Sequence, residues 1–318
     1  MQRSSLCLAC SLVFFLVTVI LFTGSPPASE AAARSDRFGP VFQQAEQTLP
    51  ASGWQSRNVV PKLDYDAHVA DLKKSIGREF TVVVEKPFVV IGDQSEKKVK
   101  QWAHGTIRWA VAQIKDSYFK EDPDHIINIW LFKDKASYEA NAKKLFGSTP
   151  TTPYGYYSPS DKALVMNIST GGGTLIHEIV HPFMAANFEA CPSWFNEGLA
   201  SLYEQSSERK RKIVGLTNWR LRGLQLAIQD DLLGSFEKLM STNDREFYEG
   251  DSTNYAQARY LCYWLQEKGE LQNFYKSFVK NAASDPEGIK TLKAILKTED
   301  LEAFQSHWEK YVMKLRFP

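Results

Sequence analysis

Two histidines and a glutamate give the strongest chemical signal in this sequence. The stretch His177-Glu178-Ile179-Val180-His181 has the spacing H-E-x-x-H. On a helix, residues four apart lie on the same face, so both imidazoles could bind one metal ion. Glu178 would lie beside them, within reach of a metal-bound water but outside the coordination shell. This pattern is typical of zinc-assisted hydrolysis, which needs two ligands, one general base and room for a water.

A second segment supplies a third candidate ligand. Glu197, in the stretch WFNEGLA at 194–200, follows His181 by 16 residues. That distance lets the chain turn and bring a second helix against the first. Together with His177, Glu197 would complete a two-histidine, one-glutamate zinc site whose fourth position is left for water. Glu178 could then take a proton from this water as it attacks a carbonyl.

The neighbouring side chains leave alternatives open. Ser193 could cap the second helix, and Ser201 could contact a ligand or be an exposed hydroxyl. The two histidines could also be buried without a metal, each paired with backbone or carboxylate groups. However, imidazole and carboxylate groups on an otherwise apolar helix cost several kcal/mol unless compensated, and one metal ion compensates all of them together. The sequence therefore favours the metal.

The helix that would carry the H-E-x-x-H residues is predicted to be buried. It begins after the glycines at 171–173, with Thr174 as its cap, and apolar residues cover most of its circumference. Pro182 directly follows His181, removes a backbone hydrogen bond and crowds the preceding turn. We therefore expect this helix to kink or end early, which would change the orientation of His181.

Hydrophobic periodicity predicts the other elements. Before the glycines, we expect helices at 65–76, 95–118 and 135–146, one or two strands within 80–91 interrupted near Pro87, a central strand at 126–132, and a hairpin with strands at 155–157 and 163–168. From Ser193 onward nearly all of the sequence has helical periodicity, with helices at 194–204, 218–229, 254–266, 271–280 and 301–315. The predicted class is α+β, a small mixed sheet with the active-site helix followed by a mostly helical carboxy-terminal lobe.

At the two motifs the chain resembles the gluzincin zinc metallopeptidases, in particular the peptidase MA-like proteins. The segment WFNEGLA is similar to the third-ligand segment WLNEGFA of the large zinc aminopeptidases. The resemblance implies a zincin-like fold in which His177, His181 and Glu197 bind zinc. It implies that Glu178 is the catalytic base, and that the hairpin strand at 163–168 is the sheet edge that aligns an extended peptide.

The resemblance implies a zinc metallopeptidase, most simply an endopeptidase, acting on a peptide or protein substrate. The G-x-M-E-N segment that binds a free amino terminus in the aminopeptidases has no counterpart here, which argues against that exopeptidase activity. Family members commonly use a downstream Tyr or His at the oxyanion. Tyr255 is the candidate, although it could simply pack at the start of its helix. The alternatives are an exopeptidase, a hydrolase of another amide bond, and a non-catalytic zincin-like scaffold. The open fourth position and Glu178 argue against the scaffold.

The amino-terminal segment has the composition of an export signal. Arg3 precedes an apolar core at 12–22, and the alanines at 31–33 offer a cleavage site. An uncleaved membrane anchor is the alternative, because the apolar run extends back to about 17 residues, the lower limit for a span. Either way, residues 1–33 predict a folded part outside the cytoplasm, secreted, periplasmic or anchored.

Composition and cysteines set the remaining limits. Apolar residues make up 43% of the 318 residues and the formal net charge is +1, so nothing indicates a nucleic-acid partner.

The sequence predicts a linker at residues 34–60 and one domain at 61–318. Within this domain we expect an α/β part at about 61–190 and a helical lobe at about 191–318. Cys191 and Cys262 could form a disulfide or remain two buried thiols.

Overall fold

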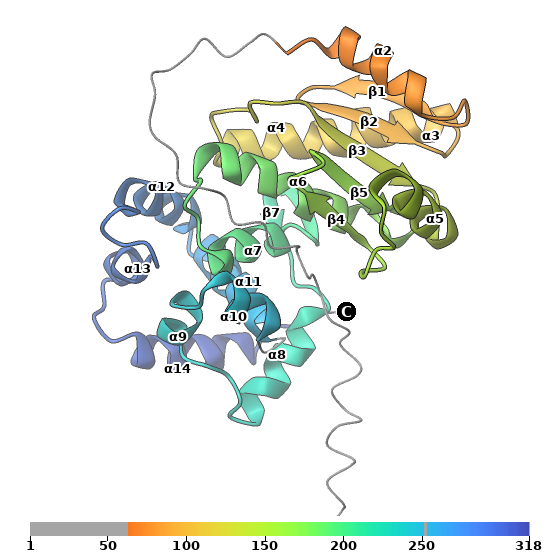
Figure 1. Ribbon diagram of the computed structural model, residues 1–318. Coiled ribbons are helices and arrows are strands. Elements are labelled where there is room, and N and C mark those ends of the chain that lie inside the picture. The colour runs from red at the N-terminus through yellow and green to blue at the C-terminus, as the bar shows by residue number, and fades with distance from the viewer. Residues whose placement is uncertain (1–62, 251–252, 318) are drawn as a thin grey trace, which may run out of the picture. The chain divides into compact units, whose positions relative to one another are not determined.

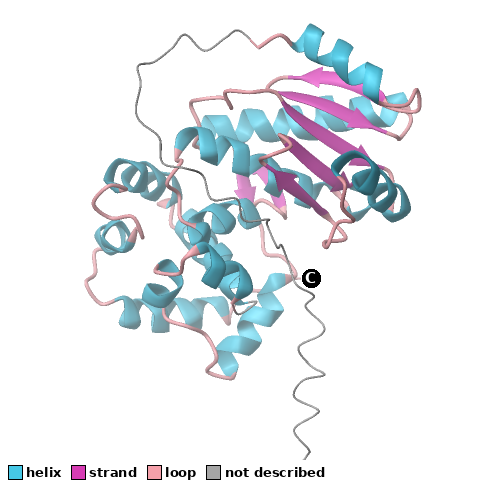
Figure 2. Ribbon diagram, in the orientation of Figure 1, coloured by secondary structure: helices cyan, strands magenta, loops and turns pink. Residues whose placement is uncertain are grey.

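The helix that carries the candidate metal ligands packs against a five-stranded mixed sheet. The computed structural model describes residues 63–250 and 253–317, and its sheet has the order β1-β2-β3-β5-β4 (Figures 1 and 2). The strands are β1 (Thr81–Glu85), β2 (Phe88–Gly92), β3 (Ile127–Phe132), β4 (Gly155–Ser158) and β5 (Ala163–Asn167). The three inner strands are parallel, and the edges β1 and β4 pair antiparallel with their neighbours. The α+β class and the central place of β3 are thus confirmed.

The hairpin strands are confirmed, but the edge assignment is wrong. Strand β5, which covers most of 163–168, lies between β3 and β4, so β4 is the edge of the sheet on this side. Every residue of β5 is buried, whereas burial alternates along β4. A continuous apolar run is typical of an interior strand. Alternation of buried and partly exposed residues is typical of a strand with one open face.

Helices cover both faces of the sheet. The alternation of side chains along β2 sends Val89 and Ile91 to one face and Phe88 and Val90 to the other. The first face packs against α2 (Tyr65–Ser75) and α5 (Lys135–Phe146). The second face packs against the helical segment 96–117 and against α6 (Gly172–Asn187), and its core continues into the carboxy-terminal helices.

The helical segment predicted at 95–118 contains a π-helical stretch. It consists of α3 (Glu96–Gln101), η2 (Trp102–Ile107) and α4 (Arg108–Ser117). The side chains of Trp102 and Thr106 lie against Gly172, the first residue of α6. Short π stretches are often found beside functional sites. Here the π stretch packs against the start of the helix that carries the candidate ligands.

The carboxy-terminal region is mostly helical, as expected. Its helices are α7 (Ser193–Leu202), α8 (Arg220–Gln229), α9 (Phe236–Met240), α10 (Asp244–Glu249), α11 (Thr253–Glu267), α12 (Leu271–Asn281), α13 (Ile289–Leu296) and α14 (Leu301–Val312). The hairpin of β6 (Ser206–Arg209) and β7 (Lys212–Gly215) was not predicted. Its turn places Lys210 and Arg211 at φ 53° and 63°, without the Gly or Asn that normally signals such a turn.

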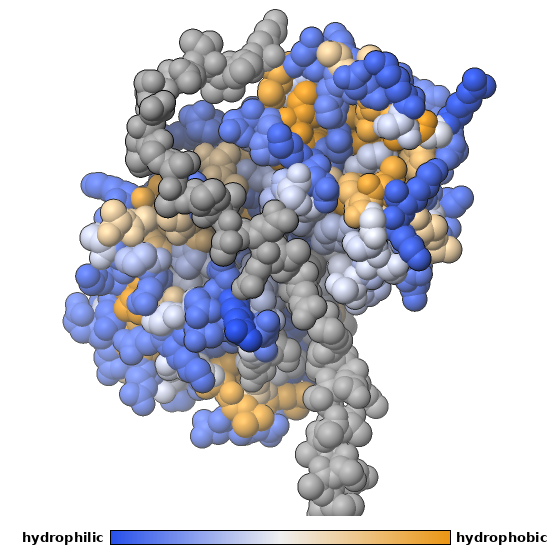
Figure 3. Space-filling view, in the orientation of Figure 1, coloured by the Kyte–Doolittle hydropathy of each residue, from blue (hydrophilic) through white to orange (hydrophobic). Residues whose placement is uncertain are grey.

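One face of the described part of the chain is largely polar. Figure 3 shows hydrophilic residues over most of one face, with apolar residues exposed in small groups. Within 63–250 and 253–317, no helix has both the length and the apolar composition needed to cross a membrane. The predicted leader at 1–33 and linker at 34–60 lie outside the described residues. Cys191 and Cys262 were predicted either to form a disulfide or to remain thiols. In the structure both are free thiols.

Candidate metal centre

The helix α6 starts at a glycine turn and runs through Pro182. Its cap is Gly171, whose φ of 105° favours glycine, and no side chain caps the helix. Thr174 lies inside the first turn, so its assignment as the cap is wrong. The helix continues to Asn187, so of the two expected effects of Pro182 the early end is wrong, and the kink stays a prediction. Because proline has no N–H, the carbonyl of Glu178 lacks its usual helical partner.

The start of α6 lies unusually close to the end of α7. A Cβ atom on Gly173 would lie 2.2 Å from the backbone oxygen of Glu204, well inside van der Waals contact. Residues 175–184 of α6 are all buried, so the helix cannot simply move away from this neighbour. Gly173 therefore permits the close approach of the two segments that carry the site.

We expect Gly173→Ala to destabilise the protein by about 1–3 kcal/mol, because the methyl group would force these two backbone segments apart. Gly105→Ala is the matched control: it is also helical, and a Cβ there meets nothing within 4 Å. The control should be neutral or slightly stabilising. Urea unfolding of both variants measures the difference, and equal stabilities would contradict the role given to Gly173.

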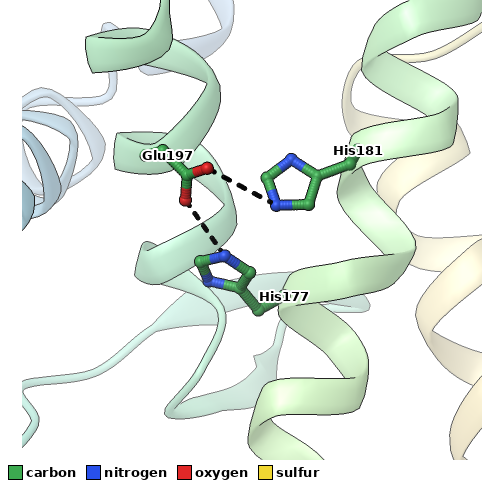
Figure 4. Close-up of side chains that lie close together, drawn as sticks. All are labelled: His177, His181 and Glu197. Carbon is green, nitrogen blue, oxygen red and sulfur yellow. Dashed lines mark ion pairs between the residues drawn. The ribbon is translucent and has the colours of Figure 1, made fainter. Parts of the chain in front are cut away.

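The structure brings together the three side chains predicted as ligands. One ligand atom each of His177, His181 and Glu197 lies within 4.8 Å of the others. The Nε2 atom of His177 lies 3.1 Å from Oε2 of Glu197, and Nε2 of His181 lies 3.8 Å from Oε1 (Figure 4). Figure 4 shows both imidazoles of α6 facing Glu197 on α7. The group is buried and has the composition of a site that could hold a metal ion.

Each histidine is held at its other nitrogen by a side chain. Nδ1 of His177 lies 3.3 Å from Oε1 of Glu204, and Nδ1 of His181 lies 3.0 Å from Oδ1 of Asn196. Nδ1 of each ring thus faces a side-chain oxygen, and Nε2 of each ring faces Glu197, where a metal would lie. This arrangement orients both rings toward Glu197.

The third ligand is held by a residue that the sequence did not reveal. The hydroxyl of Tyr248, on α10, donates a hydrogen bond of 3.0 Å to Oε1 of Glu197. The other oxygen, Oε2, is buried and faces Nε2 of His177 at 3.1 Å. Glu197 thus keeps one oxygen on Tyr248 and one available for a metal.

The charges around the site also fit a cation. Glu178, Glu197 and Glu204 are all nearly inaccessible to solvent, and Arg220 is the basic side chain that contacts one of them. Burial raises the pKa of Glu178 to about 7, and the backbone N–H of Tyr157 on β4 partly opposes that rise. Oε1 of Glu178 is buried and has no hydrogen-bond partner within 63–250 and 253–317. Glu197 and Glu204 both face the imidazole of His177, and a bound cation would help to compensate the burial of these carboxylates.

The histidines respond to these carboxylates in opposite directions. Burial disfavours the charged form of His177, but the adjacent Glu197 and Glu204 carboxylates outweigh it and raise the pKa of His177 to about 10. Burial dominates for His181 and lowers its pKa. Burial also works against the Glu197 carboxylate, yet the two histidines hold its pKa below the usual value. In the absence of a metal, the protonated imidazole of His177 thus supplies positive charge beside the Glu197 and Glu204 carboxylates.

Three other predictions have mixed outcomes. Ser193 is not the cap of α7, because Pro192 precedes the helix and the Ser193 hydroxyl instead donates to Asp244. Ser201 is fully buried, so it is not an exposed hydroxyl, and its Oγ has no hydrogen-bond partner in the described part of the chain. Tyr255 is buried, with the guanidinium of Arg220 5.3 Å from its ring centre. A role for Tyr255 in catalysis stays a prediction.

Glu204 and Asn196 were missed, although a signal existed for both. Asn196 precedes the proposed ligand Glu197, and Glu204 follows it by seven residues, a spacing that returns to the same face of a helix. Tyr248 lies 51 residues after Glu197, and no local pattern marks it.

A protein-family model matches part of the chain. Residues 172–287 match a family described as "Protein of unknown function (DUF1570)". No curated protein matches the chain. The matched segment begins at the first residue of α6 and contains all three candidate ligands, together with Glu178, Glu204 and Tyr248. Over the segment that holds its candidate metal centre, the chain is therefore similar to a family whose description assigns no function.

Proposed function

We propose that the protein is an exported zinc-dependent peptidase. The observation that carries the proposal is the buried group of His177, His181 and Glu197 with the glutamate Glu178 beside it. Two imidazoles, one carboxylate and no cysteine ligand are typical of catalytic zinc sites, whereas structural sites mostly use four Cys or His ligands. The export part of the proposal rests on residues 1–33, which lie outside the described residues.

Glu178 would act as the general base. Its Oε2 atom lies 3.9 Å from Nε2 of His181, so the carboxylate is adjacent to the ligands. When bound, zinc supplies a Lewis acid that lowers the pKa of water and polarises a carbonyl. Glu178 would accept a proton from the attacking water and pass it to the leaving amine. Its buried position and raised pKa suit a group that must both take and release a proton near neutral pH.

The edge strand β4 would hold the substrate. It is open on the side away from β5, and α6 packs against it. An extended peptide could add to this edge through main-chain hydrogen bonds, which favour peptides over other amides. Helix α6, which carries Glu178, packs against β4, and the backbone N–H of Tyr157 on β4 partly opposes the rise that burial causes in the pKa of Glu178, so the base would lie near the substrate edge.

Metal content and hydrolysis of an unstructured protein such as casein test the proposal. We expect purified protein to carry about one zinc per chain and to cleave casein. A chelator should abolish cleavage, and added zinc should restore it. Protein that binds zinc but cleaves nothing in a broad peptide library would indicate a non-catalytic scaffold instead. Protein that binds no zinc under any condition would overturn the proposal.

A further inference from the structure

A buried ion pair lies directly behind the first candidate ligand. The guanidinium of Arg220 donates two hydrogen bonds to Glu204, from Nε to Oε2 at 2.9 Å and from Nη2 to Oε1 at 2.7 Å. The amide of Asn218 donates a third, 3.0 Å long, to Oε2. Both side chains of the ion pair are largely buried, with 13% of Arg220 and 6% of Glu204 exposed. A two-point contact of this kind fixes the plane of the carboxylate.

The fixed carboxylate in turn contacts His177. Oε1 of Glu204 lies 3.3 Å from Nδ1 of the imidazole, on the side of the ring opposite Glu197. Since Arg220 and Asn218 hold both oxygens of Glu204, this carboxylate cannot rotate to release the ring. The contact selects the orientation in which Nε2 of His177 points toward Glu197.

We propose that Arg220 is a positioning residue for the metal centre, which acts through Glu204 to orient His177 and thereby sets the affinity for the metal. The inference rests on the metal site of the proposed function. It does not require the protein to be a peptidase. Arg220 comes from α8, after the β6–β7 hairpin, so a segment with no predicted ligand of its own controls the site.

Aromatic rings also hold the guanidinium of Arg220, unlike that of an arginine in a simple surface ion pair. Arg220 also lies 5.3 Å from the ring of Tyr255 and 5.8 Å from that of Trp219, so its position is fixed from two further directions. In comparison, Arg222 lies two residues further along the same helix and is exposed. Arg222 is thus a matched control of the same charge on the same element.

A double-mutant cycle on zinc affinity tests the inference. The variants are Arg220→Met, Glu204→Gln and the two combined, and the zinc Kd is measured by competition with a chromophoric chelator. We expect each single variant to bind zinc about 10–100-fold more weakly. We expect the combined variant to bind no more weakly than Glu204→Gln, because Arg220 acts only through Glu204. Arg222→Met should keep the wild-type Kd.

The absorption spectrum of bound Co²⁺ reports the geometry of the metal site. It would not change if Arg220 only stabilised the fold. Glu204→Gln and Arg220→Met should both change the visible bands of bound Co²⁺, and in the same direction, because both release the same ring. Should Arg220→Met alone fail to fold, the comparison of Glu204→Gln with the combined variant still decides the point. Weaker zinc binding by the combined variant would show that Arg220 acts independently of Glu204 and would overturn the inference.

The outcomes separate this inference from the proposed function. A wild-type protein that binds no zinc contradicts the proposed function. A wild-type protein that binds zinc, together with an unchanged Kd in Arg220→Met and Glu204→Gln, contradicts the positioning role alone.

Discussion

Replacing Glu178 by Gln is expected to leave zinc bound while lowering kcat about 100- to 10,000-fold, the usual contribution of a general base. Gln has the same shape as Glu but cannot accept the proton of the attacking water. The side chain is buried, and one of its oxygens has no hydrogen-bond partner among the residues that the structure describes, so removing its charge should not unfold the protein. Zinc per chain and kcat on casein are the two measurements.

Glu189→Gln is the matched control for this experiment, because Glu189 is exposed just beyond the end of α6. It should change neither zinc content nor kcat. If Glu178→Gln kept the wild-type kcat, Glu178 would not be the base. If it lost zinc, Glu178 would be a ligand, and the division of roles within the H-E-x-x-H motif would be wrong.

Replacing Glu197 by Ala should weaken zinc binding about 100- to 1,000-fold. Structural zinc sites bind with roughly 10–16 kcal/mol over four ligands, so one ligand contributes about 3–4 kcal/mol. The change also removes the acceptor for the Tyr248 hydroxyl and the carboxylate beside both histidines. The Kd for zinc and the increase of Tm on adding zinc measure this loss, since a ligand raises Tm only if it binds the folded state.

The two variants serve as controls for each other, because Glu178→Gln should keep the zinc-dependent rise in Tm and Glu197→Ala should lose most of it. Unchanged zinc affinity in Glu197→Ala would mean that another carboxylate completes the site. Glu178 is the nearest candidate, since its Oε2 atom lies 3.9 Å from Nε2 of His181.

Much of the site was predictable because its main residues lie on two helices close in sequence. The H-E-x-x-H spacing placed His177 and His181 on one helix face, and the buried character of that helix followed from its apolar residues. Glu197 followed from one chain reversal between α6 and α7. These are local patterns, and local patterns are what a single sequence carries.

The groups that hold the ligands were not predictable in the same way. Arg220 reaches Glu204 only because the β6–β7 hairpin turns the chain back, and that hairpin lacks the usual turn residues. Tyr248 reaches Glu197 through the packing of α10 on α7. Such contacts depend on tertiary structure, which hydrophobic periodicity does not encode.

The boundaries at Gly171 and Pro182 were wrong for a related reason. Local sequence preferences favour threonine over glycine at the N-cap of a helix, which pointed to Thr174. They disfavour proline in the interior of a helix. In the folded protein, the burial of residues 175–184 keeps the helix intact across the proline, and a glycine turn begins it. Tertiary packing outweighs local preference at both positions.

The folded unit extends beyond the matched segment 172–287, which carries the candidate ligands. Residues 169–171, immediately before α6, are exposed, while the sheet and α4, against which α6 is buried, come from earlier in the chain. A fragment of residues 172–287 would leave the apolar residues of 175–184 without that covering and would aggregate. A chain cut by a protease at 169–171 would instead stay together as two associated pieces, held by the same packing that holds the intact protein.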